Sequence, residues 1–262
     1  MIYLGQVKLN YIFVKKLNQM KKIITAILLL VFLGVACKNG GTSETKDSTT
    51  SSSETKEEAK SGHAICLYDK LSIRDKPSKK NGKWLTSMSL GEKVEYTGEE
   101  VFDSISKRKF CKVKLIDGKE GWTQSNLMAI NGEVGAMKDE TTVYKRPDLL
   151  TKTDKTYSPM DIVAIMTTQG DWMQIKGKRA NGEYIEEGWI KSSNISNSPV
   201  DIATAKFAGM AMTKPSMTEK IKALQELTNN SDYATSSFIP LLEEKIQEYQ
   251  EKNVPIDAED AL

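Results

Sequence analysis

The sequence predicts a mainly β protein: two small β-barrels in tandem, preceded by a disordered linker and followed by an α-helical C-terminal region. Three observations lead to this. Short β-branched and aromatic runs, separated by turn residues, occur as two similar series from residue 61 onward. After Pro199 the apolar residues change to helical spacing. Residues 38–60 contain mostly Ser, Thr and charged side chains, which bury too little apolar surface to offset the entropy lost on ordering.

The first segment, residues 1–36, has the layout of a signal peptide. The run from Ile23 to Cys37 has 15 uncharged residues, fewer than the roughly 20 that a helix needs to cross a bilayer. Lys21 and Lys22 precede this run, and small residues end it, as in an export signal. Because this signal is complete from Met20, we expect translation to start there; a longer leader from Met1 is the alternative.

The end of that run, LGVAC, resembles the lipobox of bacterial lipoproteins, in which small residues precede a cysteine that is acylated after cleavage. Here Leu33 lies four residues before the cysteine, and Gly34 occupies the position where the family prefers Leu. The resemblance implies that Cys37 carries lipid, such as palmitate, and holds the protein to a membrane of the cell envelope, at the outer membrane or facing the periplasm. Residues 37–60 would then form a lipidated tether with a reach of about 25–30 Å. A core helix ending in an unmodified cysteine is the alternative.

The charge of the chain argues against nucleic acid as a partner. The full sequence has 37 basic and 35 acidic residues, but residues 1–36 hold five lysines and no acid. From Cys37 onward the formal charge is therefore −3. With no basic surplus to neutralise phosphates, we expect no nucleic-acid binding.

The other two cysteines, Cys66 and Cys111, lie in strand-like runs with apolar neighbours. In an exported protein they could form a disulfide, which requires Cα atoms within about 7 Å. The alternative is that both are small buried hydrophobic residues. The sequence leaves both possibilities open.

Two series of β-like runs repeat at a nearly constant offset. A steady offset marks an internal repeat, and it predicts one unit at residues 61–130 and a second at residues 131–198. Roughly 60 residues form a marginal domain, so we expect the two units to share an interface. Matching residues lie 67 to 70 positions apart: Pro77 and Pro147, Val94 and Val163, Trp122 and Trp189, and Leu127 and Ile195.

The order of these runs resembles the bacterial SH3-like domain (SH3b). That family has an opening strand with an arginine and a proline, a Gly-x-x-Val strand, an aromatic strand and a closing Gly-Trp pair. Copy one has Arg74 at the opening position, whereas in copy two Lys145 and Arg146 are shifted by about one residue. In copy two Met160 also replaces Gly91. The resemblance implies two small barrels whose loops bind cell-wall peptides or an envelope protein.

Aromatic side chains on or near the predicted loops are the candidate ligand-binding residues. Exposed aromatic rings offer rigid contact area at low entropic cost. For each residue, ordinary packing in the core or at its rim is the alternative. The candidates are Tyr68, Trp84, Phe102, Tyr144 and Tyr184.

The C-terminal region, residues 199–262, is predicted to be helical. Helices are expected over residues 203–212 and 216–230, the second with a capping box formed by Ser216 and Glu219. A third helix fits the run around Pro240, which is tolerated only in a first turn. Their apolar faces would pack on one another or on the second β unit, or they would recruit a partner protein.

We expect no catalytic centre, metal or cofactor. The chain has a single histidine, His63, and on a strand it would face away from Cys66, three residues on. No His-Glu-x-x-His run is present. Taken with the absence of catalytic motifs, the resemblances to lipoproteins and to SH3b domains imply a lipid-anchored, non-catalytic envelope protein that binds cell-wall peptide or a protein partner. The alternatives are an assembly scaffold acting through the C-terminal helices and an accessory subunit of a cell-wall hydrolase.

Overall fold

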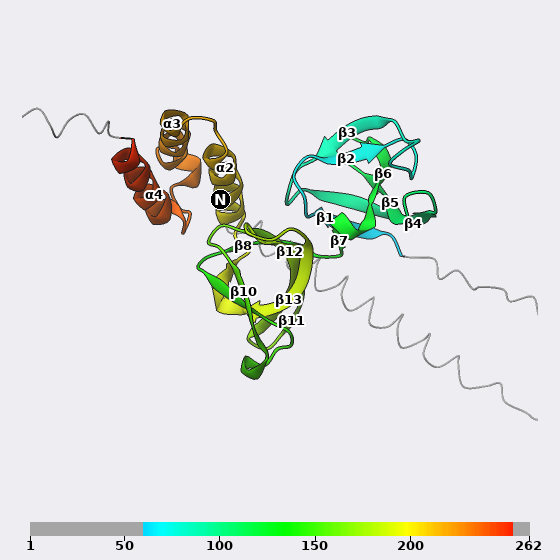
Figure 1. Ribbon diagram of the computed structural model, residues 1–262, viewed down its shortest axis with the longest axis horizontal. Helices are drawn as coiled ribbons and strands as arrows, with labels where there is room; N and C mark the ends of the chain where they lie inside the picture. Colours follow the sequence, from blue (N-terminus) through cyan, green and yellow to red (C-terminus); the bar gives the residue numbers. More distant parts are fainter. Residues whose placement is uncertain (1–59, 254–262) are drawn as a thin grey trace, which may run out of the picture. The chain divides into compact units, whose positions relative to one another are not determined.

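The computed structural model describes residues 60–253, which all lie within one compact unit. The predicted signal peptide, Cys37 and all but the last residue of the linker lie outside the described residues. The described part contains two seven-stranded sheets and, at its C-terminal end, three α-helices (Figure 1). The prediction of a mainly β protein with a helical C-terminal region is confirmed at this level.

Both sheets are antiparallel. The first runs in the order β3-β2-β6-β5-β4-β1-β7, and the second in the order β10-β9-β13-β12-β11-β8-β14. The first contains β1 (Gly62–Cys66), β2 (Leu71–Arg74), β3 (Trp84–Met88), β4 (Lys93–Asp103), β5 (Arg108–Lys114), β6 (Glu120–Gln124) and β7 (Met128–Ile130). The second contains β8 (Glu133–Met137), β9 (Thr141–Tyr144), β10 (Lys152–Tyr157), β11 (Ile162–Gln169), β12 (Trp172–Lys178), β13 (Ile185–Lys191) and β14 (Ile195–Ser196).

The two sheets have the same strand order when each is counted from its own first strand. The equivalent tryptophans also have equivalent partners: Trp122 pairs with Arg74, and Trp189 pairs with Tyr144. Tyr144 therefore occupies the position of the opening arginine in copy two. The repeat predicted from residue offsets is thus a repeat of topology and register.

A glycine precedes the tryptophan in both copies because the neighbouring strand lies too close for a side chain. A Cβ atom at Gly121 would lie 2.4 Å from Cγ2 of Ile73, and one at Gly188 would lie 2.3 Å from Cγ1 of Val143. Both distances are well below a van der Waals contact. The glycine of each Gly-Trp pair is therefore required by the close approach of the neighbouring strand.

The turn at Gly91 and Met160 keeps its geometry although its residue type changes. Gly91 has φ of 77° and Met160 has φ of 66°, so both lie in the left-handed region. Each backbone amide donates to an equivalent carbonyl, of Cys66 and Met137 respectively, at 2.8 Å in both copies. The absence of glycine in copy two thus leaves the turn intact.

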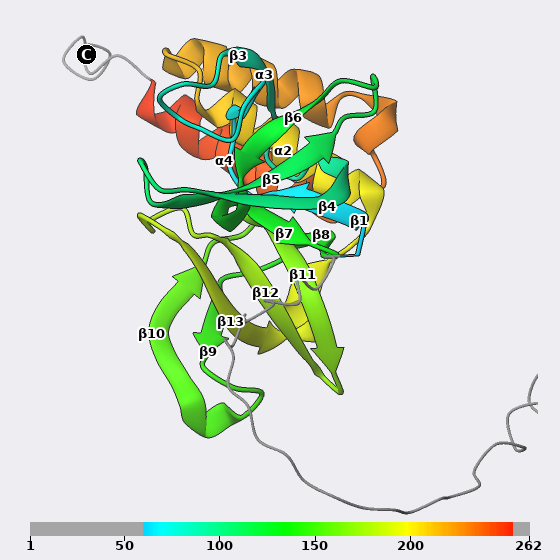
Figure 2. The ribbon, with the colours of Figure 1, turned by 90° about the vertical axis from the view of Figure 1, so that its right-hand side faces the viewer.

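β1 is buried on both faces. Ala64 and Cys66 enter the core of the first sheet, whereas Ile65 and Leu67 face the other way. That second face belongs to a separate apolar cluster with Ala129 of β7 and with residues of β8 and β11, including Ala164. Figure 2 shows β1 and β7 beside β8 and β11. This cluster joins the two sheets.

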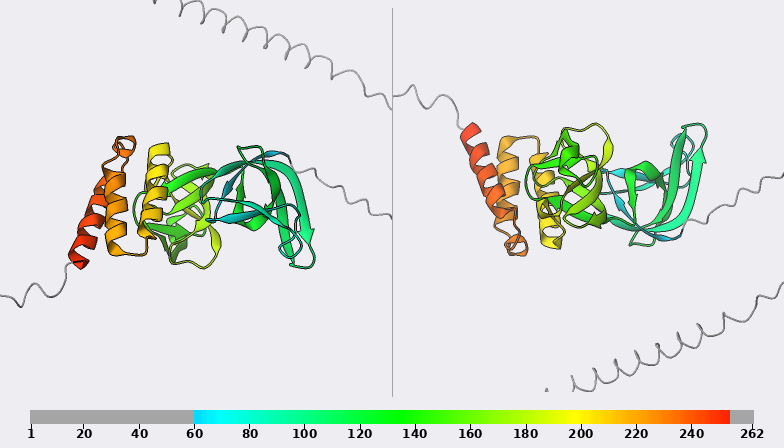
Figure 3. Two further views of the ribbon diagram at one scale, coloured as in Figure 1. Left: turned by 90° about the horizontal axis from the view of Figure 1, so that it is seen from above. Right: turned by 90° about the horizontal axis from the view of Figure 1, so that it is seen from below.

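Three helices follow the second sheet and lie side by side (Figure 3). They are α2 (Pro199–Met212), α3 (Met217–Thr228) and α4 (Ile239–Lys252). The Ser216–Glu219 capping box forms at the start of α3, and Pro240 lies in the first turn of α4, as predicted. α2 starts four residues earlier than predicted, because Pro199 is well suited to a first helical position.

The helices pack on one another through Leu224, Leu227, Leu242 and Ile246. A second cluster packs Ala205 of α2 and Phe238 against Ala136 and Ile162 of the second sheet. None of these described helices is long and apolar enough to cross a bilayer.

Cys66 and Cys111 are free, buried thiols. Of the two alternatives that the sequence left open, a disulfide or two small buried hydrophobic residues, the structure has the buried residues. Cys66 ends β1, Cys111 lies on β5, and β4 lies between these strands. Second-neighbour strands are about 10 Å apart, beyond the reach of a disulfide. The two thiols are therefore not bridged in this structure, and both sulfurs belong to the first core.

Asp201 connects α2 to the end of the second sheet and to the segment before α4. Its carboxylate accepts from the hydroxyl of Ser196 at 2.6 Å, the hydroxyl of Ser236 at 2.8 Å, and the amide and hydroxyl of Ser237 at 2.8 and 3.0 Å. Burial by itself would raise the pKa of Asp201, but these hydrogen bonds outweigh it and lower the pKa below its usual value. The ionised form therefore stabilises the fold.

Adding a methyl group at Gly188 is expected to destabilise the protein by about 1–3 kcal/mol, because the new Cβ would overlap Val143. Gly209→Ala is the matched control: no atom lies within 4 Å of its Cβ position in the interior of α2, so it should stabilise by about 0.5–1 kcal/mol. Urea unfolding of both variants measures the difference. Equal effects of the two substitutions on the free energy of unfolding would contradict the close approach of Val143 to Gly188.

Asp201→Asn is expected to lower the free energy of unfolding at neutral pH by about 2–3 kcal/mol, because charge-assisted hydrogen bonds are lost. A lowered pKa means that this contribution is present above about pH 4 and is lost as the pH falls through the folded-state pKa. The difference between the parent and the variant should therefore shrink in acid. Asp232→Asn, at an exposed acid, should change stability by less than about 0.5 kcal/mol. A pH-independent difference at Asp201 would refute this account.

Candidate functional site

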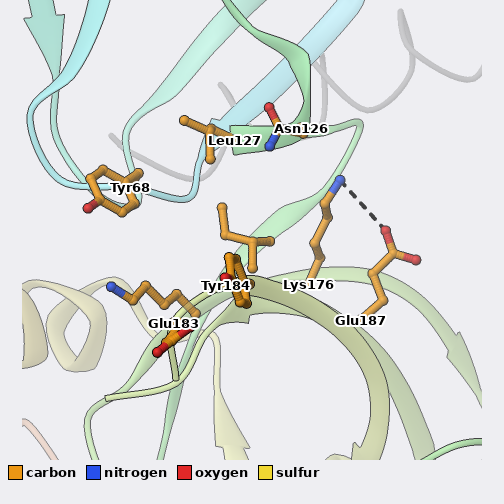
Figure 4. A pocket seen from close by; sticks show the side chains of 9 residues that line it. Tyr68, Asn126, Leu127, Lys176, Glu183, Tyr184 and Glu187 are labelled. Atoms are coloured by element: carbon orange, nitrogen blue, oxygen red, sulfur yellow. Dashed lines mark ion pairs between the residues drawn. The ribbon is translucent and has the colours of Figure 1, made fainter. Parts of the chain in front are cut away.

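A cavity of about 580 Å³ lies between the first and second sheets and opens to solvent (Figure 4). We call it the two-tyrosine pocket. Its volume is within the range of small-molecule and peptide sites. The first sheet contributes Tyr68, Asn126 and Leu127, and the second contributes Lys176, Lys178, Glu183, Tyr184, Ile185 and Glu187.

The lining residues are placed by the cluster that joins the sheets. Tyr68 directly follows Leu67, whose amide donates to the carbonyl of Leu127 at 3.0 Å. Ile185, at the start of β13, packs against the same cluster as Leu67. The pocket therefore has apolar side chains on both sheets beside the place where the sheets meet.

The aromatic residues that line the pocket are two tyrosines, and both are exposed. Tyr184 is 73% exposed and Tyr68 is 45% exposed. Lys178 Nζ lies 5.4 Å from the centroid of the Tyr68 ring, a cation–π distance across the two sheets. Because these rings are exposed in the described chain, they offer contact area to a ligand.

Charges of both signs surround the rings. Lys176 and Lys178 are two positions apart on β12 and so share one face of the strand. Lys176 pairs with Glu187 of β13 at 3.6 Å, the ion pair drawn in Figure 4. Glu183 lies in the loop between these two strands. Such a mixed lining suits a ligand that carries both carboxylates and amines.

The thiol nearest to the pocket is not set up as a nucleophile. The Cys66 thiol is buried and donates to the carbonyl of Tyr68 at 3.0 Å. Burial raises the pKa of Cys66 to about 12 and that of Cys111 to about 11, so both thiols stay protonated at neutral pH. His63 is engaged elsewhere, with Nε2 3.0 Å from the carbonyl of Gly132 and 3.2 Å from Glu133.

The structure brings together two of the five predicted aromatic residues, Tyr68 and Tyr184. Trp84 on β3 and Phe102 on β4 are 62% and 64% exposed, but neither lines the pocket. Tyr144 is half-buried and packs edge-on against Trp172, with the ring centroids 4.9 Å apart. It lines a different cavity, of about 420 Å³, on the second sheet.

Sequence reasoning did not identify the charged and apolar residues of the pocket. One signal was present for Lys176 and Lys178, which lie two positions apart, the spacing of residues on one face of a strand. Nothing comparable marks Asn126 or Leu127, which lie in the short 3₁₀ turn Ser125–Leu127. Within residues 60–253, no group of three or more His, Cys, Asp or Glu residues is arranged to hold a metal ion.

Comparisons with known proteins assign no family to the chain. No family model matches the sequence, and no curated protein matches it. Among solved structures, NlpC2 from Trichomonas vaginalis is similar over 60% of this chain and 57% of its own, with 14% identity and a TM-score of 0.22. NlpC1 from the same organism is similar over 61% of this chain and 55% of its own, with 13% identity and a TM-score of 0.21. The matches span little more than half of those chains, and scores this low identify neither a fold nor an activity. The SH3-like and lipoprotein assignments stay predictions.

Proposed function

We propose that this protein is a lipid-anchored, non-catalytic protein of the cell envelope that binds a cell-wall peptide in the two-tyrosine pocket. Cys37 holds the chain to a membrane, and the Ser- and Thr-rich linker presents the β units. The observation that carries the proposal is the pocket itself, because it places two exposed tyrosines among lysines and glutamates.

The chemistry of the pocket supports a peptide ligand. Tyrosine hydroxyls donate to and accept from peptide amides, while the rings cover apolar side chains. Lys176 and Lys178 can pair with a carboxylate of the ligand, and Glu183 and Glu187 can pair with an amine. Cell-wall peptides, which the resemblance to SH3b domains implies as ligands, carry both kinds of group.

The protonation of the thiols supports a binding role over a hydrolytic one. A cysteine hydrolase needs a thiolate, which requires a lowered pKa or an adjacent base. In this protein burial raises the pKa of both described thiols. His63, the one histidine of the chain, interacts with a backbone carbonyl and a glutamate instead.

Tyr184→Ala is expected to weaken binding to purified peptidoglycan about tenfold or more, because truncating a central aromatic contact removes much of the binding energy. Sedimentation with insoluble peptidoglycan over a range of protein concentrations measures it. Phe102→Ala is the matched control, since this ring is similarly exposed but lies outside the pocket. If both variants bind peptidoglycan equally well, the two-tyrosine pocket is not the binding site. If the parent protein does not bind peptidoglycan, cell-wall peptides are not its ligand.

Membrane attachment is expected to depend on Cys37. Intact-mass analysis of protein extracted from membranes should give a chain that begins at Cys37 with acyl groups on it, because two or more acyl chains give stable anchoring. The Cys37→Ala protein should carry no acyl mass. An unmodified sulfur at Cys37 in the parent protein would refute the anchor.

A further inference from the structure

One end of the first sheet concentrates positive charge. The loop between β2 and β3, residues 75–83, carries Lys76, Lys79, Lys80 and Lys83, all exposed. The turn between β4 and β5, with the start of β5, residues 103–109, carries three more exposed basic residues: Lys107, Arg108 and Lys109. We call these two segments the basic end.

The acidic residues of the basic end are used to fold it. The Asp75 carboxylate accepts from the amide of Lys83 at 2.6 Å. Asp103 accepts from the hydroxyl of Ser106 at 2.6 Å and from the amide of Ile105 at 3.2 Å. Seven basic and two acidic side chains give this end a formal charge of +5, in a chain whose charge from Cys37 onward is −3.

Most of these cations have no ion-pair partner. Of the seven, Lys109 alone pairs with a carboxylate, that of Glu100, among the residues that the structure describes. Arg108 donates to the side-chain amide oxygen of Gln124 instead. The remaining five lysines and Arg108 are therefore available to an anionic partner.

The two segments are held together and in fixed conformations. The hydroxyl of Ser106 and, from the other segment, that of Ser78 both donate toward Asp103 and help to lower the pKa of its carboxyl. Arg74 donates to the carbonyl of Gly82 at 2.7 Å and so closes the loop from β2. A rigid arrangement of charges loses little entropy on binding.

Large apolar side chains flank the charges. Ile105 at the turn and Phe102 before it are both 64% exposed, and Trp84, directly after the loop, is 62% exposed. Basic residues mixed with exposed aromatic and aliphatic groups are typical of surfaces that rest at a bilayer interface. A soluble polyanion would neutralise the charges but leave these apolar groups in water.

The direction of β1 places the start of the described chain on the same side of the first sheet as the basic end. β1 is antiparallel to β4, with Gly62 opposite Tyr96 and Ile65 opposite Lys93. The chain before Gly62 therefore enters the sheet from the side on which β4 continues toward the turn after Asp103. In the proposed function the linker from the lipidated Cys37 joins the sheet on this side, so this step rests on the proposed function.

We propose that the basic end is a docking surface for an anionic lipid bilayer. Its lysines and Arg108 bind lipid phosphates, while Phe102, Ile105 and Trp84 enter the headgroup region. The lipid anchor supplies attachment, and the basic end supplies orientation, so that the first sheet meets the membrane and the two-tyrosine pocket stays open for its ligand.

The test uses a chain of residues 38–262, which lacks the leader and the acylated cysteine and retains the whole compact unit. It should co-sediment with vesicles that contain phosphatidylglycerol, not with vesicles of phosphatidylcholine alone, and high salt should release it. The variant Lys79→Glu/Lys80→Glu/Lys107→Glu should bind the anionic vesicles at least about tenfold more weakly. Lys138→Glu/Lys145→Glu/Lys152→Glu makes the same change of net charge at exposed lysines of the second sheet and should bind nearly as the parent chain.

Equal losses in the two triple variants, or no preference of the parent chain for anionic vesicles, would overturn the proposal. Phe102→Ser/Ile105→Ser separates a bilayer from a soluble polyanion: it should weaken vesicle binding and leave binding to polyphosphate unchanged. If it leaves both unchanged, the surface is a polyanion site and the bilayer is excluded. Tyr184→Ala, which tests the peptide pocket, should bind vesicles as the parent does, so failure of one proposal is distinguishable from failure of the other.

Discussion

The burial of β1 on both faces is the constraint on which the arrangement of the two sheets depends. A strand in an antiparallel sheet commonly presents one face to water, and here Ile65 and Leu67 would be on that face. Exposing them would cost about 1.5–3 kcal/mol each, so the second sheet covers them. The covering residues come from β8 and β11, strands whose other residues contribute to the second core and to the contact with α2. The same two strands thus connect both cores to the helices.

The candidate site follows from that constraint. Tyr68 is the residue at which the chain leaves the buried cluster after Leu67, and Tyr184 directly precedes Ile185, which returns to it. Each tyrosine faces solvent because its neighbour in sequence, Leu67 or Ile185, packs into the apolar cluster between the two sheets. A ligand in the pocket would touch both sheets, so its affinity and the strength of the contact between the sheets are thermodynamically linked.

Much of the fold could be predicted from the sequence, because the signals are local. Alternation of apolar residues, the Ser216–Glu219 capping box and the constant offset of the two copies each depend on residues close in sequence or on self-similarity. The pocket could not be predicted in this way. Tyr68 and Tyr184 could be named individually as exposed aromatics, but their meeting depends on packing between sheets. The absence of a bond between Cys66 and Cys111 likewise depends on β4 lying between their strands, which sequence spacing does not reveal.

The turn shared by Gly91 and Met160 gives the two copies different neighbours. At Gly91 a Cβ atom would come within 3.3 Å of Ile162 in the second sheet, so a bare backbone permits the sheets to approach. Met160, at the same left-handed position, extends a side chain that packs against the helical clusters. In each copy the residue at this position contacts the part of the fold that follows that copy in the chain. The two copies are therefore not interchangeable at this position: a side chain at residue 91 would press on Ile162, and a glycine at residue 160 would remove an apolar contact with the helices.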